Sequence, residues 1–425
     1  MKVLWISNIV FPEVDALLSG KSYAGGSGGW LTSLANAIKE EVCLVVAAPS
    51  RRVGKLRKVE VGGIVHYIIP FGKGNEKYNR EYEPIWREIK NAVKPDLVHI
   101  HGTEYSHGLA YLRACGSENV VVSIQGVMTE IARHYLDGLS NKDILHNLTL
   151  HDVFKTTLWG TKKKAKERAK SEPEMLRMVK NVIGRTDFDH ANVLSINPSI
   201  KYYHCDEVLR DEFYTGKWVY DKCTAHTIFI SNGKYPLKGF HMLLRALPLI
   251  IEKYPNVMVK VAGGNNPIGC GFKYRIKTNG YQNIIAHSIL SNSLLPHIKF
   301  LGILSADEMK KQMLDANIFL VPSSNENSSN SLGEAQLLGV PCLASFVGGL
   351  PTMIPNNECG EMYNYFDTNM LAYKLCNIFE NSSSFDNSNM ILHATKRHDK
   401  DVIKKTLLKI YCQILEGADE ISKKN

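Results

Sequence analysis

The chain has 425 residues, of which 44% are hydrophobic and 22% are charged, and its formal net charge at pH 7 is +9. These values exclude a disordered or fibrous protein and fit two globular domains of about 150 to 200 residues each. A positive charge of this size favours small anionic ligands or an acidic surface, rather than nucleic acid, as the partner.

No apolar run approaches the ~18 to 20 residues that a membrane-spanning helix needs. The best stretch, residues 243–251, is short and contains Arg245. The N-terminus carries no small-residue cleavage site before Pro12, so we expect no signal peptide. The nine cysteines are scattered singly, without a Cys-x-x-Cys pair, and we expect them to be reduced and to bind no metal. Together these features predict a cytoplasmic protein.

Short apolar runs alternate with longer helical patterns along the chain. The strands predicted in the first half are residues 2–8, 44–50, 96–102, 120–126 and 192–198, and those in the second half are 227–233, 257–264, 298–302, 317–323 and 340–346. The runs are continuous rather than alternating, which is typical of strands buried on both faces of parallel sheets. Two such series predict two doubly wound, Rossmann-like α/β domains that bind ligands outside the carboxyl ends of their strands.

The predicted domain limits follow from where this pattern lapses. Over residues 201–222 strand character gives way to aromatic and charged residues, so we place the linker at 206–225, between an N-terminal domain of residues 1–205 and a C-terminal domain of residues 226–395. Residues 396–425 form a last helix, expected over 400–417, that packs back toward the N-terminal domain. The cleft between the two domains is the expected ligand site.

A glycine-rich segment, GGSGGWLTSLANAI at residues 25–38, precedes an apolar helical pattern. The first N–H groups of a helix lack intrahelical partners and attract anions, and Gly28 and Gly29 would allow the backbone to approach a phosphate closely. A flexible turn explains the glycines equally well. The segment lies too far past the first strand to be a dinucleotide fingerprint.

The densest basic run, residues 162–170, has the sequence KKKAKERAK. Such a run would suit anionic lipid headgroups, each nearby cation contributing about 1 kcal/mol. A solvated helix face is the alternative interpretation.

The stretch VPSSNENSSNSLGEAQLLGVPCLAS, residues 321–345, holds two acids separated by seven residues, Glu326 in a polar loop and Glu334 at a predicted helix start. That helix start would offer free N–H groups from about Ser329 to Gly333. A carboxylate accepts two hydrogen bonds at once, which suits the vicinal hydroxyls of a ribose or hexose. Stabilisation of an acid by the helix dipole would explain Glu334, but not the polar loop around Glu326.

These residues, from Glu326 through Glu334 to Pro341 and on to Gly348-Gly349, resemble the donor-binding half of the retaining GT-B glycosyltransferases of family 4. Lys238-Gly239 is similar to the phosphate-binding Lys-Gly of that family, and Gly28-Gly29 to its N-terminal glycine loop. The resemblance covers most of the chain and is strongest over residues 226–355.

The resemblance implies a GT-B fold, with two Rossmann-like domains facing across a cleft and a nucleotide sugar bound to the C-terminal one. It implies Lys238 on the diphosphate, Glu334 on the ribose and Glu326 beside the transferred sugar. It also implies catalysis without a metal, so we expect no Mg²⁺ at the Asp-x-Asp tripeptide Asp187-Phe188-Asp189. The donor-binding residues expected on this basis are Gly28, Gly29, Lys234, Lys238, Asn330, Ser331, Leu332, Gly333 and Glu334.

The chain departs from the family pattern in two places. Asn232 and Gly233 stand where the family usually has an arginine, and Lys234 is the nearest cation. Gln125 stands where many members have a histidine, and a glutamine accepts no proton at neutral pH.

The expected catalytic residues are Glu326, Lys238 and His101, the last at the end of the predicted strand 96–102. Gln125 and Arg185 are expected on the acceptor side. A structural histidine at position 101 and a structural pair of Arg185 with Asp187 are the alternatives.

The implied reaction moves a hexose, with its anomeric configuration kept, from a nucleotide diphosphate sugar to a glycan or lipid-linked acceptor. A UDP-sugar is the default donor, the base is expected near residues 300–304, and no further cofactor is expected. Surface polysaccharide synthesis at the inner face of the cytoplasmic membrane would suit the basic run. The alternatives are a nucleotide-sugar epimerase or hydrolase of the same fold and a non-catalytic nucleotide-sugar binding protein.

Overall fold

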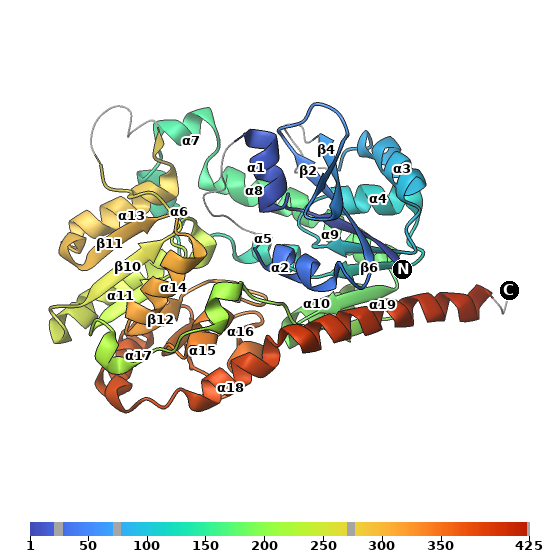
Figure 1. The fold of residues 1–425 in the computed structure, drawn as a ribbon. Coiled ribbons are helices and arrows are strands. Elements are labelled where there is room, and N and C mark those ends of the chain that lie inside the picture. The colour runs from blue at the N-terminus through green and yellow to red at the C-terminus, as the bar shows by residue number, and fades with distance from the viewer. Residues whose placement is uncertain (21–28, 71–77, 270–276, 423–425) are drawn as a thin grey trace. The chain divides into compact units, whose positions relative to one another are not determined.

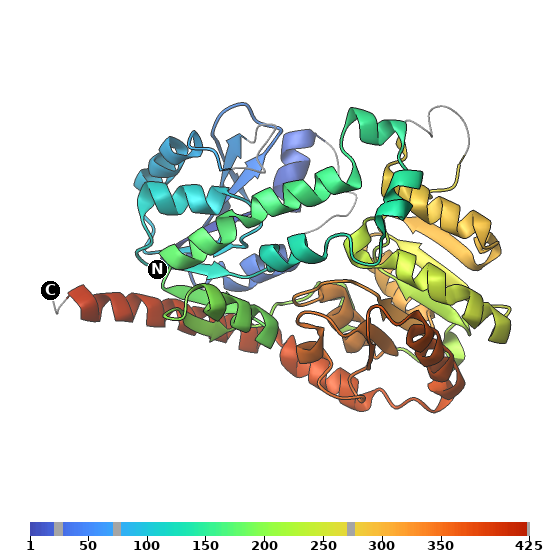
Figure 2. The same cartoon turned by 180° about the vertical axis from the view of Figure 1, so that it is seen from behind.

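The computed structural model describes residues 1–20, 29–70, 78–269 and 277–422, with side chains up to residue 417. The chain forms two compact units. Unit 1 comprises residues 1–129, 165–209 and 398–425, and unit 2 comprises residues 130–164 and 210–397. Each unit is a sheet with helices on both of its faces (Figures 1 and 2).

The sheet of unit 1 has eight strands in the order β3-β4-β2-β1-β5-β6-β7-β8. All neighbouring strands pair in parallel except β3 and β4, which form an antiparallel hairpin. The central strands are buried on both faces, which explains their unbroken apolar runs. The strands are β1 (Lys2–Ser7), β2 (Cys43–Ser50), β3 (Arg57–Val61), β4 (Ile64–Pro70), β5 (Leu97–His101), β6 (Val120–Ser123), β7 (Asn181–Gly184) and β8 (Lys201–His204).

Two apolar clusters, one on each face of this sheet, form the core of unit 1. Trp86 of α3 and Tyr111 of α4 lie in one cluster. Trp5 of β1 and Tyr411 of α19 lie in the other, where the indole Nε1 of Trp5 donates to the Tyr411 hydroxyl at 3.0 Å. The helices of this unit are α1 (Pro12–Ser19), α2 (Gly29–Ile38), α3 (Tyr82–Val93), α4 (His107–Cys115), α9 (Ser171–Met178), α10 (Asp187–Ile196) and α19 (Lys400–Ser422).

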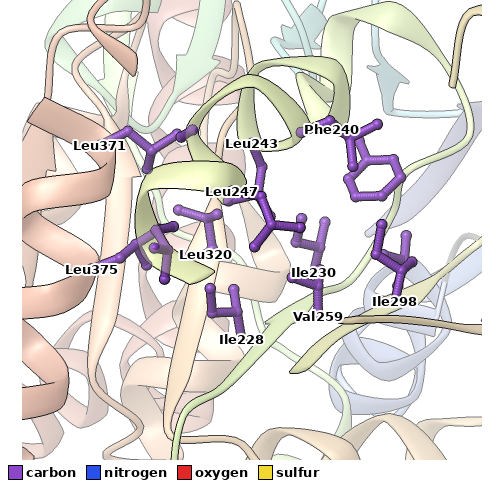
Figure 3. Close-up of a cluster of buried hydrophobic side chains, with 14 of the residues drawn as sticks. Ile228, Ile230, Phe240, Leu243, Leu247, Val259, Ile298, Leu320, Leu371 and Leu375 are labelled. Carbon is purple, nitrogen blue, oxygen red and sulfur yellow. The ribbon is translucent and has the colours of Figure 1, made fainter. Parts of the chain in front are cut away.

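The sheet of unit 2 has six parallel strands in the order β11-β10-β9-β12-β13-β14. Figure 3 shows its core, in which Leu243 and Leu247 of α11 lie over Ile228, Val259 and Leu320 of the sheet. The strands are β9 (Thr227–Ile230), β10 (Met258–Ala262), β11 (Ile298–Gly302), β12 (Ile318–Val321), β13 (Cys342–Ser345) and β14 (Glu361–Tyr363).

Three helices of unit 2 follow the carboxyl ends of β9, β12 and β13: α11 (Phe240–Lys253), α15 (Asn330–Leu338) and α16 (Leu350–Met353). The others are α6 (Asn141–His146), α7 (Leu150–Phe154), α13 (Gly280–Ser291), α14 (Ala306–Asp315), α17 (Thr368–Asn381) and α18 (Ser388–Arg397), with short 3-10 turns η1 (Asp211–Tyr214), η2 (Tyr220–Lys222), η3 (Pro236–Lys238), η4 (Leu295–His297) and η5 (Ser382–Ser384). Two helices cross from one unit to the other, α5 (Met128–His134) and α8 (Leu158–Ala169).

The predicted fold class is confirmed, because two doubly wound, largely parallel α/β units are present. The strand predicted at residues 192–198 is wrong, because these residues include the end of α10. The side chain of Thr186 accepts from the N–H of Asp189 at 3.2 Å and starts that helix. The strand beside it is β7, at Asn181–Gly184, and the hairpin of β3 and β4 and the edge strand β8 were also not predicted.

Residues 130–164 belong to unit 2, whereas the sequence placed all of residues 1–205 in the N-terminal domain. The reason is packing: Leu136, Ile144 and Leu158 are buried in the same apolar cluster as α11 and α13. Likewise the predicted linker, 206–225, is divided at Leu209 and Arg210 between the two units. Among the residues that the structure describes, no helix combines the length and the apolarity that crossing a membrane requires.

Candidate functional site

The carboxyl edge of the unit 2 sheet, where its parallel strands end, brings two of the predicted catalytic side chains into contact. Lys238 follows β9 as the last residue of η3, and Glu326 lies in the loop after the adjacent strand β12. The Lys238 ammonium donates to Glu326 Oε1, and the hydroxyl of Ser323 donates to the same oxygen at 2.8 Å. This ion pair is only partly exposed.

Two glycines permit this arrangement by adopting left-handed backbone conformations. Gly239 has φ +67° and directly follows Lys238, and a Cβ at this position would collide with the carbonyl oxygen of Pro322. Gly348 has φ +52°, and a Cβ there would collide with the carbonyl oxygen of Glu326. The close approach of these loops therefore requires glycine at both positions.

Lys238 keeps its charge although it is withdrawn from water. Burial lowers the pKa of its ammonium, but Glu326 and Tyr235 together raise it by more, and the net result is a pKa above its usual value. The side chain is therefore a cation throughout the physiological pH range.

The first turn of α15 lies at the same edge. The Ser231 hydroxyl at the end of β9 donates to the Ser331 hydroxyl at 3.1 Å and joins the two segments. Leu332 and Gly333, predicted as donors to a ligand, instead donate their N–H groups to the carbonyl oxygen of Ser329, at 3.0 and 3.1 Å. The N–H groups of Asn330 and Ser331 are the ones that helix geometry leaves for an anion.

Glu334 lies deeper than predicted, at the fifth residue of α15 rather than at its start. The residue is 2% exposed, and each carboxylate oxygen accepts a hydrogen bond of 2.7 Å from the guanidinium of Arg210. Burial raises the pKa of Glu334, and the Arg210 cation counteracts part of this rise. No local pattern could single out Arg210, because its partner lies 124 residues away.

A surface hollow beside this edge is lined by residues of β10, β11 and α13. Lys234, a predicted donor-binding residue, is exposed and lines it. Its lining includes the apolar side chains of Val261, Ile285 and Phe300 and the amide-bearing residues Asn265 and Gln282. Such a lining suits a flat heterocycle with polar edges.

In unit 1 the predicted His101 is the last residue of β5 and is 3% exposed. Its ring stacks on that of His99 at 3.8 Å between centroids, and within the described part of the chain neither ring nitrogen has a hydrogen-bond partner. Burial, with the nearby His99 and Arg185 charges, lowers its pKa well below the usual value. The residue is therefore a neutral imidazole and a weak base.

The two predicted acceptor-side residues contact each other in the interior of unit 1. Arg185 is buried, pairs with Glu207, and donates to the carbonyl oxygens of Ile124 and Gln125 at 2.8 and 3.1 Å. It also donates to the side-chain oxygen of Gln125 at 3.3 Å. These bonds tie together the ends of β6, β7 and β8, and Glu207 is an acidic partner of Arg185 that the sequence did not indicate.

The glycine loop can be placed only in part. Gly28 lies outside the described residues, whereas Gly29 is the first residue of α2 in unit 1.

A carboxylate that the sequence reasoning missed, Glu104, lies at the carboxyl edge of the unit 1 sheet. It follows β5, is half-buried, and accepts from the Asn8 amide at 2.5 Å. Withdrawal from water, with a contribution from the Glu172 carboxylate, raises the pKa of Glu104 to about 7. Glu104 could have been found from the sequence, because it follows the predicted strand DLVHIHG and so lies where ligands bind in such sheets. Within the residues described, no group of three or more His, Cys, Asp or Glu side chains is arranged to hold a metal ion.

Residues 225–381 match the family model described as glycosyl transferases group 1. Similar curated proteins include D-inositol 3-phosphate glycosyltransferases of Streptomyces avermitilis, 30% identical over 129 residues, and of Mycolicibacterium gilvum, 31% identical over 144 residues. These matches cover 29% and 34% of this chain, and only 26% and 30% of the two relatives. The likeness in sequence is thus confined to a part of each protein.

Solved structures match over nearly the whole chain. Sucrose-phosphate synthase of Thermosynechococcus elongatus has a TM-score of 0.72 at 15% identity, covering 98% of this chain and 100% of that one. HepE of Anabaena, in complex with UDP and glucose, has a TM-score of 0.66 at 14% identity, covering 97% and 100%. At these identities the likeness establishes the fold, which is GT-B.

Proposed function

We propose that the protein is a glycosyltransferase that moves a sugar from a nucleotide diphosphate sugar to a hydroxyl acceptor. The observation that carries this proposal is the contact of Lys238 with Glu326 beside the first turn of α15, within the segment that matches glycosyl transferases group 1. A permanent cation and free N–H groups at one edge suit a diphosphate, and an adjacent carboxylate suits sugar hydroxyls.

In this proposal Lys238 stabilises the departing diphosphate. Its ammonium has three N–H donors, of which one makes the hydrogen bond to Glu326, so two remain for phosphate oxygens. The N–H groups of Asn330 and Ser331 add fixed donors that need no reorganisation as the charge develops. Glu326, held by Lys238 and Ser323, accepts hydrogen bonds from hydroxyls of the transferred sugar.

We place the nucleoside in the hollow between β10, β11 and α13, with its base on Phe300 and Lys234 at the rim. Glu334 then accepts hydrogen bonds from the ribose hydroxyls with the oxygen lone pairs that do not bind Arg210. UDP is the default nucleotide. HepE was solved with UDP and glucose, and a similar fold is consistent with such a donor.

The finer features of the reaction are proposals of the same kind. We infer transfer of a hexose with retention of configuration, by attack of the acceptor hydroxyl on the face from which the diphosphate leaves. No metal and no further cofactor are required in this scheme. The acceptor is a glycan or a lipid-linked saccharide, in the synthesis of a surface polysaccharide at the inner face of the cytoplasmic membrane.

On the acceptor side Glu104 replaces the predicted His101 as the group we assign to the acceptor hydroxyl. A carboxylate with a pKa of about 7 exchanges protons near neutral pH, which a buried neutral imidazole does poorly. Arg185 and Gln125 support the neighbouring strand ends instead of meeting the acceptor directly.

The proposal is tested by incubating the purified chain with a panel of nucleotide sugars and simple glycosides and following nucleoside diphosphate release. We expect one donor to be consumed, a glycoside of retained configuration to form, and Lys238→Ala to lower turnover about 100-fold. An epimerised or free sugar as the sole product would favour the epimerase or hydrolase alternative. Donor binding without any nucleotide release would favour the non-catalytic binding protein.

A further inference from the structure

The segment of unit 2 that contains α6 and α7 exposes an unusual number of large apolar side chains. Val153 is 77% exposed and Phe154 is 79% exposed, and three leucines within the preceding residues are also exposed. Leu150, Val153 and Phe154 are spaced i, i+3 and i+4 and so share one face of α7. We call these five residues the α7 face: Leu145, Leu148, Leu150, Val153 and Phe154.

Two polar residues of the same segment, Asn147 and Asp152, are buried. Asp152, between these apolar residues in the sequence, is 4% exposed and accepts from the N–H of Gly280 at 3.1 Å. It also closes a capping box with Thr149. Asn147 is buried as well, and its side-chain oxygen accepts from Asn283 at 3.3 Å. The segment is therefore held firmly to unit 2 by polar bonds, with its apolar side outward.

This orientation is the reverse of that of an ordinary surface helix, which buries its apolar face. Keeping a phenylalanine and a valine in water gives up the free energy that burial would supply, and such contiguous exposure marks an interaction surface. The α7 face would therefore suit a partner with an apolar interior.

Basic residues border the α7 face. Lys142 and Lys155 are exposed at the two ends of the segment, and Lys163 is exposed in the first half of α8. Within residues 141–155 the acids are Asp143, which lies 3.6 Å from Arg245, and the buried Asp152. The outward charge is thus positive.

We propose that the α7 face docks the protein on the surface of an anionic lipid bilayer. Val153, Phe154 and the leucines enter the boundary between headgroups and acyl chains, while Lys142 and Lys155 remain among the anionic headgroups. A second copy of the chain is the less suitable occupant. In a two-fold contact the same patch would meet itself and bring lysine against lysine. The proposal does not depend on the transfer reaction.

Vesicle co-sedimentation of the full chain tests this directly. We expect binding to vesicles of phosphatidylcholine mixed with phosphatidylglycerol, weak binding to phosphatidylcholine alone, and a loss of binding at high salt. The double variant V153S/F154S is expected to weaken partitioning at least about tenfold, because two large apolar side chains no longer insert. Each of K142Q and K155Q is expected to weaken it about fivefold.

The matched control is F366S/Y373S, which removes two comparably exposed aromatic side chains elsewhere on unit 2 and is expected to leave partitioning unchanged. Circular dichroism confirms that each variant folds. Equal binding of V153S/F154S and the wild type would overturn the proposal. The proposal would also be overturned if, in sedimentation velocity without lipid, the wild type were a dimer and this variant a monomer. The α7 face would then bind a second copy of the chain.

Discussion

The buried pair of Arg210 and Glu334 allows a quantitative test of the electrostatics of unit 2. Both oxygens of Glu334 accept from the guanidinium at 2.7 Å, and the carboxylate is almost wholly buried. Arg210→Met keeps much of the apolar length of the side chain but removes its charge. The variant leaves an ionised carboxylate in the interior with no cation beside it.

Breaking a buried pair by removing one partner costs about 3 to 5 kcal/mol. The Arg210 side chain is 25% exposed, so water relieves part of this cost, and we take about 3 kcal/mol. For a unit of this size each kcal/mol lowers the melting temperature by about 2 to 4 °C. We therefore expect the unfolding transition of unit 2 to fall by about 6 to 12 °C at neutral pH.

The loss of stability in Arg210→Met depends on pH, and the direction of this dependence follows from the pKa of Glu334. Burial already raises the pKa of Glu334 in the folded protein above its unfolded value, and removing Arg210 raises it further. The folded variant therefore binds a proton more tightly than the unfolded chain. The destabilisation is absent below the unfolded pKa and grows as the pH rises toward and through the folded pKa.

Differential scanning calorimetry of the wild type, R210M, E334Q and the double variant at pH 5 and pH 8 measures these effects. We expect R210M to lose more at pH 8, and the double variant to recover at least half of the loss because no charge remains buried. A melting temperature of R210M equal to that of the wild type would refute this reasoning. A double variant as unstable as R210M would do the same.

Four further predictions concern the site and the two cores. Glu334→Ala is expected to weaken nucleotide-sugar binding by about 1.5 to 3 kcal/mol in titration calorimetry, the usual contribution of hydrogen bonds to a charged group. Gly239→Ala is expected to lower turnover at least as much as Lys238→Ala does, because the left-handed backbone and the Pro322 contact exclude a Cβ; kinetics with full donor saturation measures this. Leu247→Ala, at the centre of the cluster in Figure 3, is expected to cost about 2 to 5 kcal/mol in urea unfolding. Burial lowers the pKa of His66 to about 4, so the free energy of unfolding of the wild type falls as the pH drops from the unfolded pKa toward 4. His66→Phe is expected to reduce this dependence of the free energy of unfolding on pH by up to about 1.4 kcal/mol per pH unit, in unfolding measured at pH 7, 6 and 5.

The fold was predictable because its signals are local. Continuous apolar runs such as KVLWIS and TIFI are buried on both faces of parallel strands, as the pattern indicates. The failure at residues 192–198 has the opposite cause, because a run of mixed apolar residues fits a strand and a helix alike. Only the cap at Thr186 decides in favour of the helix.

Features set by distant parts of the chain could not be predicted. The assignment of residues 130–164 to unit 2 depends on where Ile144 and Leu158 are buried. The family motif led us to expect Lys238 and Glu326 at one ligand site, but not their direct contact. The partner of Glu334 was not expected either, because no local pattern connects it to Arg210. The pKa of Glu104 likewise follows from its surroundings in the folded unit.

The binding of an activated sugar by its diphosphate at the carboxyl edge of the unit 2 sheet can be measured by titration calorimetry. The full chain and Lys238→Ala are each titrated with UDP-, GDP- and ADP-sugars. We expect one nucleotide sugar to bind the wild type and Lys238→Ala to weaken this binding at least about tenfold, because the variant loses a charged hydrogen bond to phosphate. Equal affinity of the two proteins for that donor, or no binding of any nucleotide sugar, would contradict this expectation.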